Sequence, residues 1–153
     1  MHSVLFVCSA NICRSPMAQG LFLARLGGDI ADWRVQSAGV WARDGYSAHA
    51  NTLSILRDRG VDLSAHRSRQ VNLEIMENFK LILTMESGHK EALQAAFPQY
   101  AERVYLLTEI VGQQFDIVDP VGGPFIEFEA TAGEIDDLLG RGFDRLKELA
   151  REA

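Results

Sequence analysis

Along the chain, short runs of hydrophobic residues alternate with segments in which hydrophobic residues recur at the spacing of a helix. Residues 4–7 form a continuous apolar run, which is typical of a strand buried on both faces. The stretches WRVQSA at 33–38, FKLILTM at 79–85 and VYLL at 104–107 predict three more strands. Over 16–26 the apolar residues instead recur every three or four positions, which predicts an amphipathic helix.

Three further helices are expected in the intervals after the second strand. One lies around residues 53–58 and is ended by Gly60, because glycine suits the backbone just beyond a helix. The second covers 86–97, before a proline. The third runs from about 127 to the C-terminus and is weakened at 140–142, where two glycines occur.

This alternation of strands and helices predicts an α/β fold. Strands separated by helices pair in parallel through right-handed crossovers. The chain shows no repeat, no low-complexity tract and no linker, so we expect a single domain over residues 1–153. At 153 residues, 47% of them hydrophobic, it is long enough to bury one core. The predicted architecture is a small four-stranded parallel sheet flanked by helices.

Composition narrows the classes of partner. The formal net charge of -6 and the sequence pI near 5.2 argue against nucleic acid. No apolar run approaches the roughly 20 residues that a membrane helix needs, and the N-terminus does not resemble a signal peptide. We therefore expect a cytoplasmic protein with no membrane partner. Two cysteines and four dispersed histidines suggest neither a disulfide framework nor a metal site, and we expect no metal and no cofactor.

The first strand leads into the residues that carry the candidate chemistry. Residues 4–7 end at Cys8, and Ser15 followed by Pro16 predicts the start of a helix. Parallel sheets bind ligands at the carboxyl ends of their strands, and a helix N-terminus offers free N–H groups and a positive dipole end to an anion. The same field favours the thiolate form of a cysteine, and the forked guanidinium of Arg14 suits two phosphate oxygens. We expect a phosphate-binding loop between the first strand and the first helix.

A plainer interpretation of the same residues remains open at this point. A cysteine that ends an apolar strand is most often a small buried hydrophobe, and the bare pattern C-x5-R arises by chance. The preceding strand and the Ser-Pro helix start favour the anion site, because together they build what the chemistry needs. A nucleotide-binding loop is disfavoured, since the chain has no G-x-x-x-x-G-K-[ST] motif.

The stretch VLFVCSANICRSPMAQGLF resembles the phosphate-binding loop and first helix of the low-molecular-weight protein tyrosine phosphatases, whose pattern is V-C-x-G-N-x-C-R-S-P. The segments WRVQSAGVWARDGYSAH, GVDLSAHRSRQV, FKLILTM and VDPVGGPFIEFE follow the family's order and spacing, so the resemblance covers essentially the whole chain. It implies a cysteine-dependent phosphatase. In it Cys8 attacks phosphorus, Arg14 holds the phosphoryl oxygens, and Asp119 acts as general acid and later as general base.

The resemblance also implies roles for residues in and around the loop. Asn11 suits a left-handed backbone, and by resemblance Ser37 and His66 brace it. Ser15 has two compatible roles, as a helix cap and as a hydroxyl donor to the thiolate. Ala10 stands where the family usually has glycine, so we expect a local conformation that tolerates a Cβ. The expected phosphate-binding residues beside the cysteine and the arginine are Ser9, Ala10, Asn11, Ile12, Cys13 and Ser15.

Departures from the family pattern concern the substrate cleft, for which we expect contributions from Ile12, Trp41 and Val121. Many members carry two tyrosines after the Asp-Pro pair, where this chain has Val121 and Gly122, so one aromatic wall is missing. Trp41 matches a position at the cleft entrance, although a core position is an equally open interpretation. Ile12 offers an apolar surface that favours a phenyl ring.

The predicted activity is hydrolysis of phosphotyrosine in proteins through a phosphocysteine, with a tyrosine kinase as a possible partner. A protein-arginine phosphatase is the main alternative, because the tail DPVGGPFIEFE is similar to bacterial members, and those that act on phosphoarginine carry threonine where Ile12 stands. An arsenate reductase would need a third cysteine, and a non-catalytic phosphate-binding module would have no use for Asp119. The physiological substrate, the oligomeric state and a reversible disulfide between Cys8 and Cys13 stay open.

Overall fold

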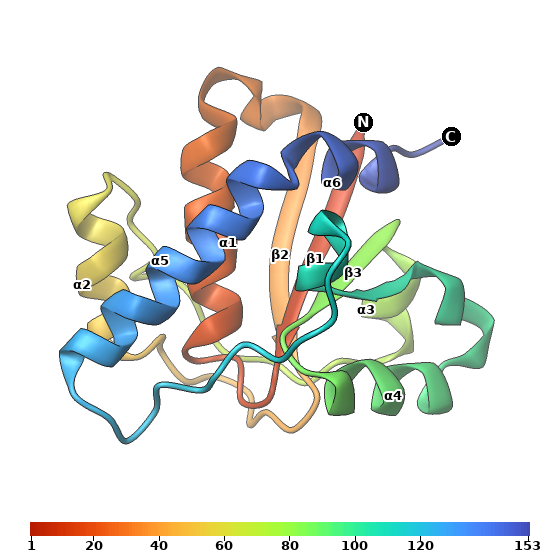
Figure 1. Cartoon of the computed structure of the whole chain (residues 1–153). Helices are drawn as coiled ribbons and strands as arrows, with labels where there is room; N and C mark the ends of the chain where they lie inside the picture. The colour runs from red at the N-terminus through yellow and green to blue at the C-terminus, as the bar shows by residue number, and fades with distance from the viewer.

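The chain folds into a parallel β-sheet with helices on both of its faces (Figure 1). The computed structural model describes all residues, 1–153. The strand order is β2-β1-β3-β4, and each neighbouring pair is parallel. The strands are β1 (His2–Cys8), β2 (Trp33–Gly39), β3 (Leu81–Thr84) and β4 (Val104–Leu106). The α-helices are α1 (Arg14–Leu26), α2 (Ala50–Asp58), α3 (Leu73–Glu77), α4 (Ser87–Ala96), α5 (Phe125–Arg141) and α6 (Phe143–Ala150). Short 3-10 helices are η1 (Gly27–Asp32), η2 (Pro98–Arg103) and η3 (Leu107–Val111).

The α/β class and the four-stranded parallel sheet are as predicted, and the differences from the prediction are local. Helix α3 was not predicted, because its five residues are too short to show a period; Asn72 caps it by accepting a hydrogen bond from Ile75 N. The C-terminal helix is divided into α5 and α6 at Gly142, as the glycines indicated. Helix α1 begins at Arg14, two residues before the expected first position, Pro16.

The continuous apolar run of β1 is explained by its place inside the sheet. Val4 and Phe6 point into a core shared with α1, α2, α5 and α6, whereas Leu5 and Val7 point into a second core with α3 and α4. Because successive side chains of a strand alternate between faces, a strand covered on both sides must be apolar at every position. The two cores together pack the sheet between two layers of helices.

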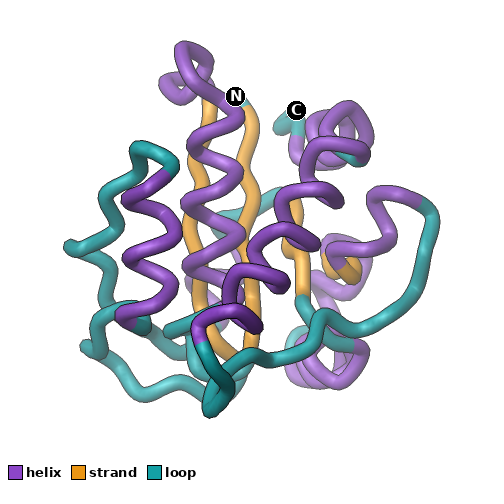
Figure 2. Tube along the Cα trace, turned by 60° about the vertical axis from the view of Figure 1, so that its left-hand side comes forward, coloured by secondary structure: helices purple, strands orange, loops and turns teal.

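The loops that follow the strands gather at one end of the molecule (Figure 2). All strands run in the same direction, so their carboxyl ends meet at this end. Strand β1 lies between β2 and β3, which places Cys8 in the middle of that edge. Gly39, its partner on β2, has no room for a side chain, because a Cβ there would lie 3.1 Å from Asn11 N and closer still to Ser9 O. The β2 end and the loop after β1 are therefore in close contact.

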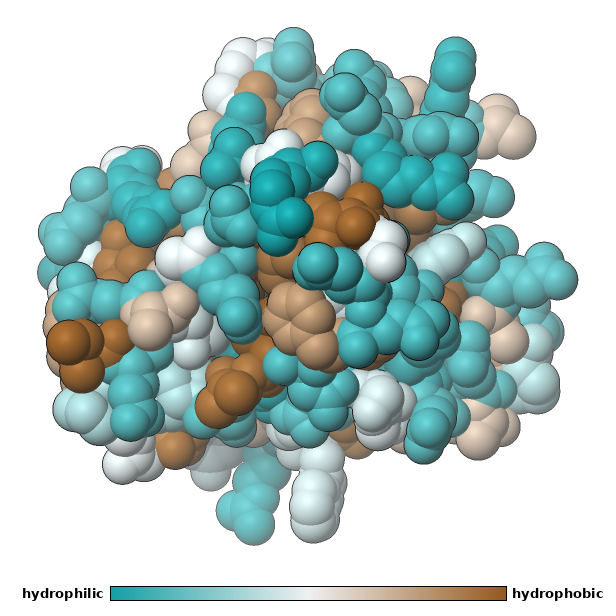
Figure 3. All heavy atoms as spheres, viewed as in Figure 1, coloured by the Kyte–Doolittle hydropathy of each residue, from teal (hydrophilic) through white to brown (hydrophobic).

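The surface is mostly hydrophilic on the face seen in Figure 3, with hydrophobic residues in separate small areas. Several large exposed apolar side chains, Trp41, Tyr46, Val118 and Val121, come from segments that follow β2 and β4. None of the helices combines the length and the apolar character that crossing a bilayer requires.

Candidate active site

The loop of residues 8–14, which joins β1 to α1, has its carbonyl groups occupied by neighbouring segments. The segment after β2 donates two N–H groups to the carbonyls of Cys8 and Ser9, at 3.0 and 2.9 Å. His49 N donates to the Ile12 carbonyl at 2.7 Å. The N–H groups of residues 9–13, by contrast, donate to no acceptor of the chain. A row of free N–H groups at a helix N-terminus is a site for an anion.

Asn11 is the centre of the hydrogen bonds that shape the 8–14 loop. It is the only non-glycine residue with a positive φ, at 59°. Its Nδ2 donates to Ser15 Oγ at 2.8 Å and to Ser37 Oγ at 2.9 Å, while its Oδ1 accepts from Arg69 N at 3.1 Å. His66 Nε2 lies 2.8 Å from the Asn11 carbonyl. The structure thus brings together Asn11, Ser37 and His66, and it adds the Arg69 N–H, which the sequence did not indicate.

The protonation of His66 follows from its partner. A carbonyl oxygen only accepts, so Nε2 of His66 carries the proton that is given to Asn11 O. Burial lowers the pKa of His66, the nearby Arg69 and Arg67 lower it further, and the bond to Asn11 partly opposes this. The neutral imidazole already supplies the donor that this bond needs.

Ser15 lies beside the thiol. Its Oγ is 3.0 Å from Cys8 Sγ and 3.4 Å from the Ala38 carbonyl. Because Ser15 Oγ already accepts from Asn11 Nδ2, its single proton is free to be donated, and the sulfur is the nearer acceptor. The expectation that Ser15 caps α1 is wrong: the N-cap is Cys13, which makes no side-chain cap bond, and the serine hydroxyl is turned toward the sulfur instead.

Arg14 is held with one edge of its guanidinium occupied. The side chain is buried, and Nη1 donates to Glu86 Oε2 at 2.5 Å and to the Ile117 carbonyl at 2.6 Å. Nη2 lies 3.6 Å from Asp119 Oδ2, and Nε makes no hydrogen bond within the chain. The edge formed by Nε and Nη2 therefore remains available for two oxygens of an anion. The sequence analysis did not identify Glu86 as a site residue, although it lies two residues after the end of β3, at the carboxyl edge of the sheet.

Asp119 stands at the mouth of the site. Its side chain is 44% exposed, and its Oδ1 accepts from Val121 N at 3.0 Å. The residues after it form a tight turn in which Gly123 N donates to the Pro120 carbonyl and Gly122 has a φ of 89°. The carboxyl group is thus fixed near the guanidinium while still reaching solvent.

A cleft of about 360 Å³ adjoins the 8–14 loop, and Ile12 and Trp41 both line it. Trp41 is 88% exposed, so the alternative of a core position is excluded. Val121 is exposed but is not among the residues that line this cleft. The other lining residues are Ala10, Arg43, Tyr46, Ser47 and Ser68.

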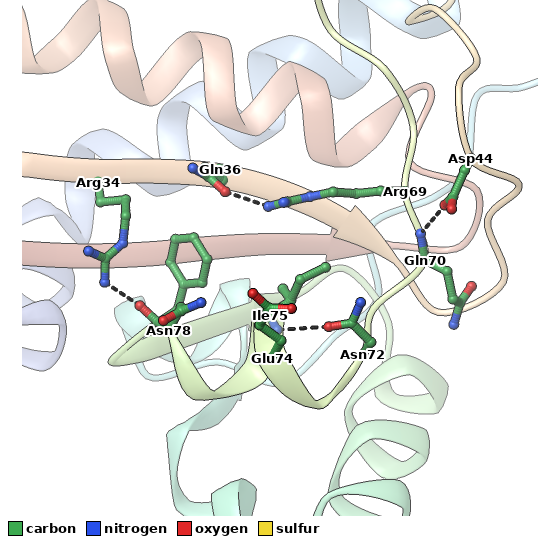
Figure 4. A pocket seen from close by; sticks show the side chains of 10 residues that line it. Arg34, Gln36, Asp44, Arg69, Gln70, Asn72, Glu74, Ile75 and Asn78 are labelled. Carbon is green, nitrogen blue, oxygen red and sulfur yellow. Dashed lines mark hydrogen bonds between the residues drawn. The ribbon is translucent and has the colours of Figure 1, made fainter.

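A second cleft, of about 530 Å³, lies beside the outer edge of β2 (Figure 4). It is polar, and none of the three candidate catalytic residues lines it. Arg69 points into it and donates from Nη2 to Gln36 Oε1 at 2.5 Å, while the N–H of the same residue faces Asn11. The segment that braces the 8–14 loop therefore separates the two clefts.

The second cysteine differs from the first in its surroundings. Cys13 is buried next to Thr52, and burial, the largest cause, raises its pKa from 9.0 to about 12. The thiol of Cys13 is therefore protonated at neutral pH. Both cysteines are free thiols. No group of three or more His, Cys, Asp or Glu side chains is arranged to hold a metal ion.

A thiol at the end of a parallel strand, next to unpaired N–H groups and a guanidinium with a free edge, is typical of cysteine-dependent phosphatases. The comparison with known proteins agrees with this class. The family model described as low molecular weight phosphotyrosine protein phosphatase matches residues 3–152, and the chain belongs to that family.

Relatives in this family carry two kinds of name. A probable low molecular weight protein-tyrosine-phosphatase, EpsP, of Ralstonia nicotianae is 36% identical over 144 residues, which are 94% of this chain and 92% of that protein. A protein-arginine-phosphatase of Geobacillus stearothermophilus is 35% identical over 147 residues, which are 95% of this chain and 97% of that protein. The crystal structure of a low molecular weight protein tyrosine phosphatase from T. tengcongensis superimposes with a TM-score of 0.89 at 36% identity, covering 95% of this chain and 99% of the other.

Proposed function

We propose that the protein hydrolyses phosphotyrosine in protein substrates through a phosphocysteine intermediate. The observation that carries this proposal is the position of Cys8 Sγ. It accepts a hydrogen bond from the Ser15 hydroxyl at 3.0 Å and lies beside the free N–H groups of residues 9–13. These N–H groups and the free edge of Arg14 are suited to the non-bridging oxygens of a phosphoryl group.

In the first step Cys8 Sγ attacks phosphorus and forms a P–S bond. The P–O bond to the phenol breaks, and its electron pair leaves with the oxygen. Protonated Asp119 donates its proton to that oxygen, so the phenol departs neutral. Arg14 and the N–H groups stabilise the negative charge on the phosphoryl oxygens during the transfer.

In the second step water attacks the phosphocysteine. The Asp119 carboxylate takes a proton from the water as the new P–O bond forms. The P–S bond breaks, and its electron pair returns to Cys8, where the Ser15 hydroxyl stabilises the thiolate. Phosphate leaves, and the starting state is restored with Asp119 protonated. No further reactant is consumed.

The cleft favours phosphotyrosine as the phosphorylated side chain. Ile12 and Trp41 line the space beside the loop, and an apolar, partly aromatic cleft solvates a phenyl ring better than a guanidinium. Cys8 is buried, with 2% of it exposed, so we expect the short side chain of phosphoserine to leave its phosphorus out of reach. The proposed substrate is a protein that a tyrosine kinase has phosphorylated. The proposed location of both enzymes is the cytoplasm, a reducing compartment in which Cys8 and Cys13 stay as thiols.

Phosphoarginine is the second candidate, because relatives about as similar as the tyrosine phosphatases are named protein-arginine-phosphatases. The test compares kcat/KM on matched phosphotyrosine, phosphoarginine and phosphoserine peptides, for the parent protein and for Ile12→Thr. We expect the parent to prefer phosphotyrosine and Ile12→Thr to shift the ratio toward phosphoarginine. A parent that prefers phosphoarginine, or a ratio unchanged in Ile12→Thr, would show that the reasoning on Ile12 is wrong.

A further inference from the structure

A buried histidine outside the predicted site contacts the 8–14 loop. His89, on α4, is 5% exposed, and its Nε2 lies 2.9 Å from Ser9 Oγ. Its Nδ1 lies 3.1 Å from Glu86 N. A backbone N–H only donates, so Nδ1 must accept, and the neutral ring carries its proton on Nε2. The ring therefore donates to the Ser9 hydroxyl of the loop.

The second residue that bonds to His89 is Glu86, which is also the hydrogen-bond partner of Arg14. Glu86 is the N-cap of α4, and its side chain and that of His89 form the two halves of a capping box. The Glu86 carboxylate accepts from Arg14 Nη1 at 2.5 Å. One imidazole thus fixes both Ser9 and the N-cap residue that orients the guanidinium.

We propose that neutral His89 is a positioning residue, which holds Ser9 and, through Glu86, Arg14 in the geometry that binds a phosphate group, and that protonation of its ring releases this geometry. The proposal rests on the proposed phosphatase function and deepens it. It assigns the phosphate site a dependence on acid pH through a side chain that does not itself contact the phosphate group.

Protonation would break the arrangement at two atoms. A proton on Nδ1 would face the Glu86 N–H, and two donors do not bond, so the capping box would open. Nε2 lies 3.8 Å from Glu86 Oε2, the oxygen that accepts from Arg14, so a charged ring would also compete with Arg14 for that oxygen. Both changes act on the guanidinium without any contact between His89 and the substrate.

The pH at which the His89 ring becomes protonated depends on its burial and on the charges around it. Burial is the main cause that lowers the pKa of His89, and Arg14 at the start of α1 lowers it as well. Glu86 on α4 itself and Asp116 and Asp119 on the segment before α5 oppose this shift. Because the pKa lies below the ordinary value for histidine, the ring is neutral at neutral pH, and the arrangement is lost only as the pH falls.

The experiment compares two substitutions of His89 that differ in the hydrogen bonds the new side chain can make. In His89→Gln the amide oxygen accepts from Glu86 N, as glutamine does at this position of a capping box, and the amide nitrogen donates to Ser9, but the side chain does not titrate. His89→Leu keeps the bulk and removes both bonds. We would measure kcat/KM for p-nitrophenyl phosphate and the affinity for inorganic phosphate from about pH 5 to about pH 8.

We expect His89→Gln to match the parent at neutral pH and to lose less of its phosphate affinity and kcat/KM in acid. His89→Leu should lose about 10- to 100-fold in both quantities at neutral pH, the scale of two lost neutral hydrogen bonds. Asn72→Ala removes the cap of α3, whose side-chain bond is to Ile75 N and not to the 8–14 loop, so it controls for a loss of stability alone and should leave both quantities unchanged. Thermal unfolding confirms that each variant is folded at the assay temperature.

Three results would overturn the proposal: a His89→Leu variant with the parent's phosphate affinity, a His89→Gln variant as impaired as His89→Leu, or a His89→Gln variant with the parent's full loss in acid. The second of these would assign the effect to packing of the ring. Absence of turnover in the parent itself would refute the proposed function instead, and the phosphate affinities would still test His89.

Discussion

Replacing Asn11 tests how far the geometry of the 8–14 loop depends on one side chain. Asn11→Gly removes three side-chain hydrogen bonds, to Ser15, Ser37 and Arg69, but keeps a residue that accepts a φ of 59°. At about 1 kcal/mol for each bond, the free energy of unfolding should fall by about 3 kcal/mol. Asn11→Ala loses the same bonds and adds about 1–2 kcal/mol, because a Cβ is strained in the left-handed region.

The assays are urea denaturation and kcat/KM for p-nitrophenyl phosphate. We expect kcat/KM to fall by about 100-fold in both variants, since a misplacement of about 1 Å in a reacting geometry has an effect of this size. Asn72→Ala, whose side chain makes a single cap bond, should lose about 1 kcal/mol of stability and no activity. Parent-like kcat/KM in folded Asn11→Ala, or an alanine variant more stable than the glycine variant, would refute this reasoning.

Three further predictions concern the acid, the second thiol and pH. Asp119→Ala should slow phenyl phosphate far more than p-nitrophenyl phosphate, because the poorer leaving group needs the proton more; an equal loss on both would indicate a structural role. Mild peroxide should oxidise Cys8, and disulfide formation with Cys13 should be slow at neutral pH, since the Cys13 pKa is raised to about 12; mass spectrometry that finds a rapid, complete disulfide would contradict this. The pKa of His66 is lower in the folded protein than in the unfolded chain, so just below the ordinary histidine pKa the folded protein binds fewer protons. The free energy of unfolding should therefore fall as the pH falls through that range. Urea midpoints that depend on pH no more in the parent than in His66→Gln would exclude this contribution.

The sheet and its strand–loop–helix unit were predictable, because their signals are local. The apolar run of 4–7 indicates a strand covered on both faces, and the glycines near 140–142 mark the break between α5 and α6. Helix α3 was missed because five residues do not establish a period. Its existence depends on packing of Ile75 and Met76 against the sheet, which is a tertiary effect.

The site was predictable only where its residues share one stretch of sequence or a family motif. Glu86 and His89 lie more than 70 positions from the loop that they contact, and only the pairing of β3 with β1 brings them there. Their position in the first residues after β3 was a usable signal, since the segments that follow parallel strands meet at one edge of the sheet. Of the two roles expected for Ser15, the bond to the Cys8 sulfur agrees with the structure and the helix cap is wrong, because a sequence shows the residue type but not the direction of its hydroxyl.

Turnover of p-nitrophenyl phosphate by the purified protein and by Cys8→Ser tests the central claim most directly. Serine keeps the N–H groups of the loop and Arg14, so Cys8→Ser should still bind inorganic phosphate or vanadate. It should nevertheless show no turnover, because its hydroxyl is a far weaker nucleophile than a thiolate. Parent-like turnover by Cys8→Ser would contradict the account.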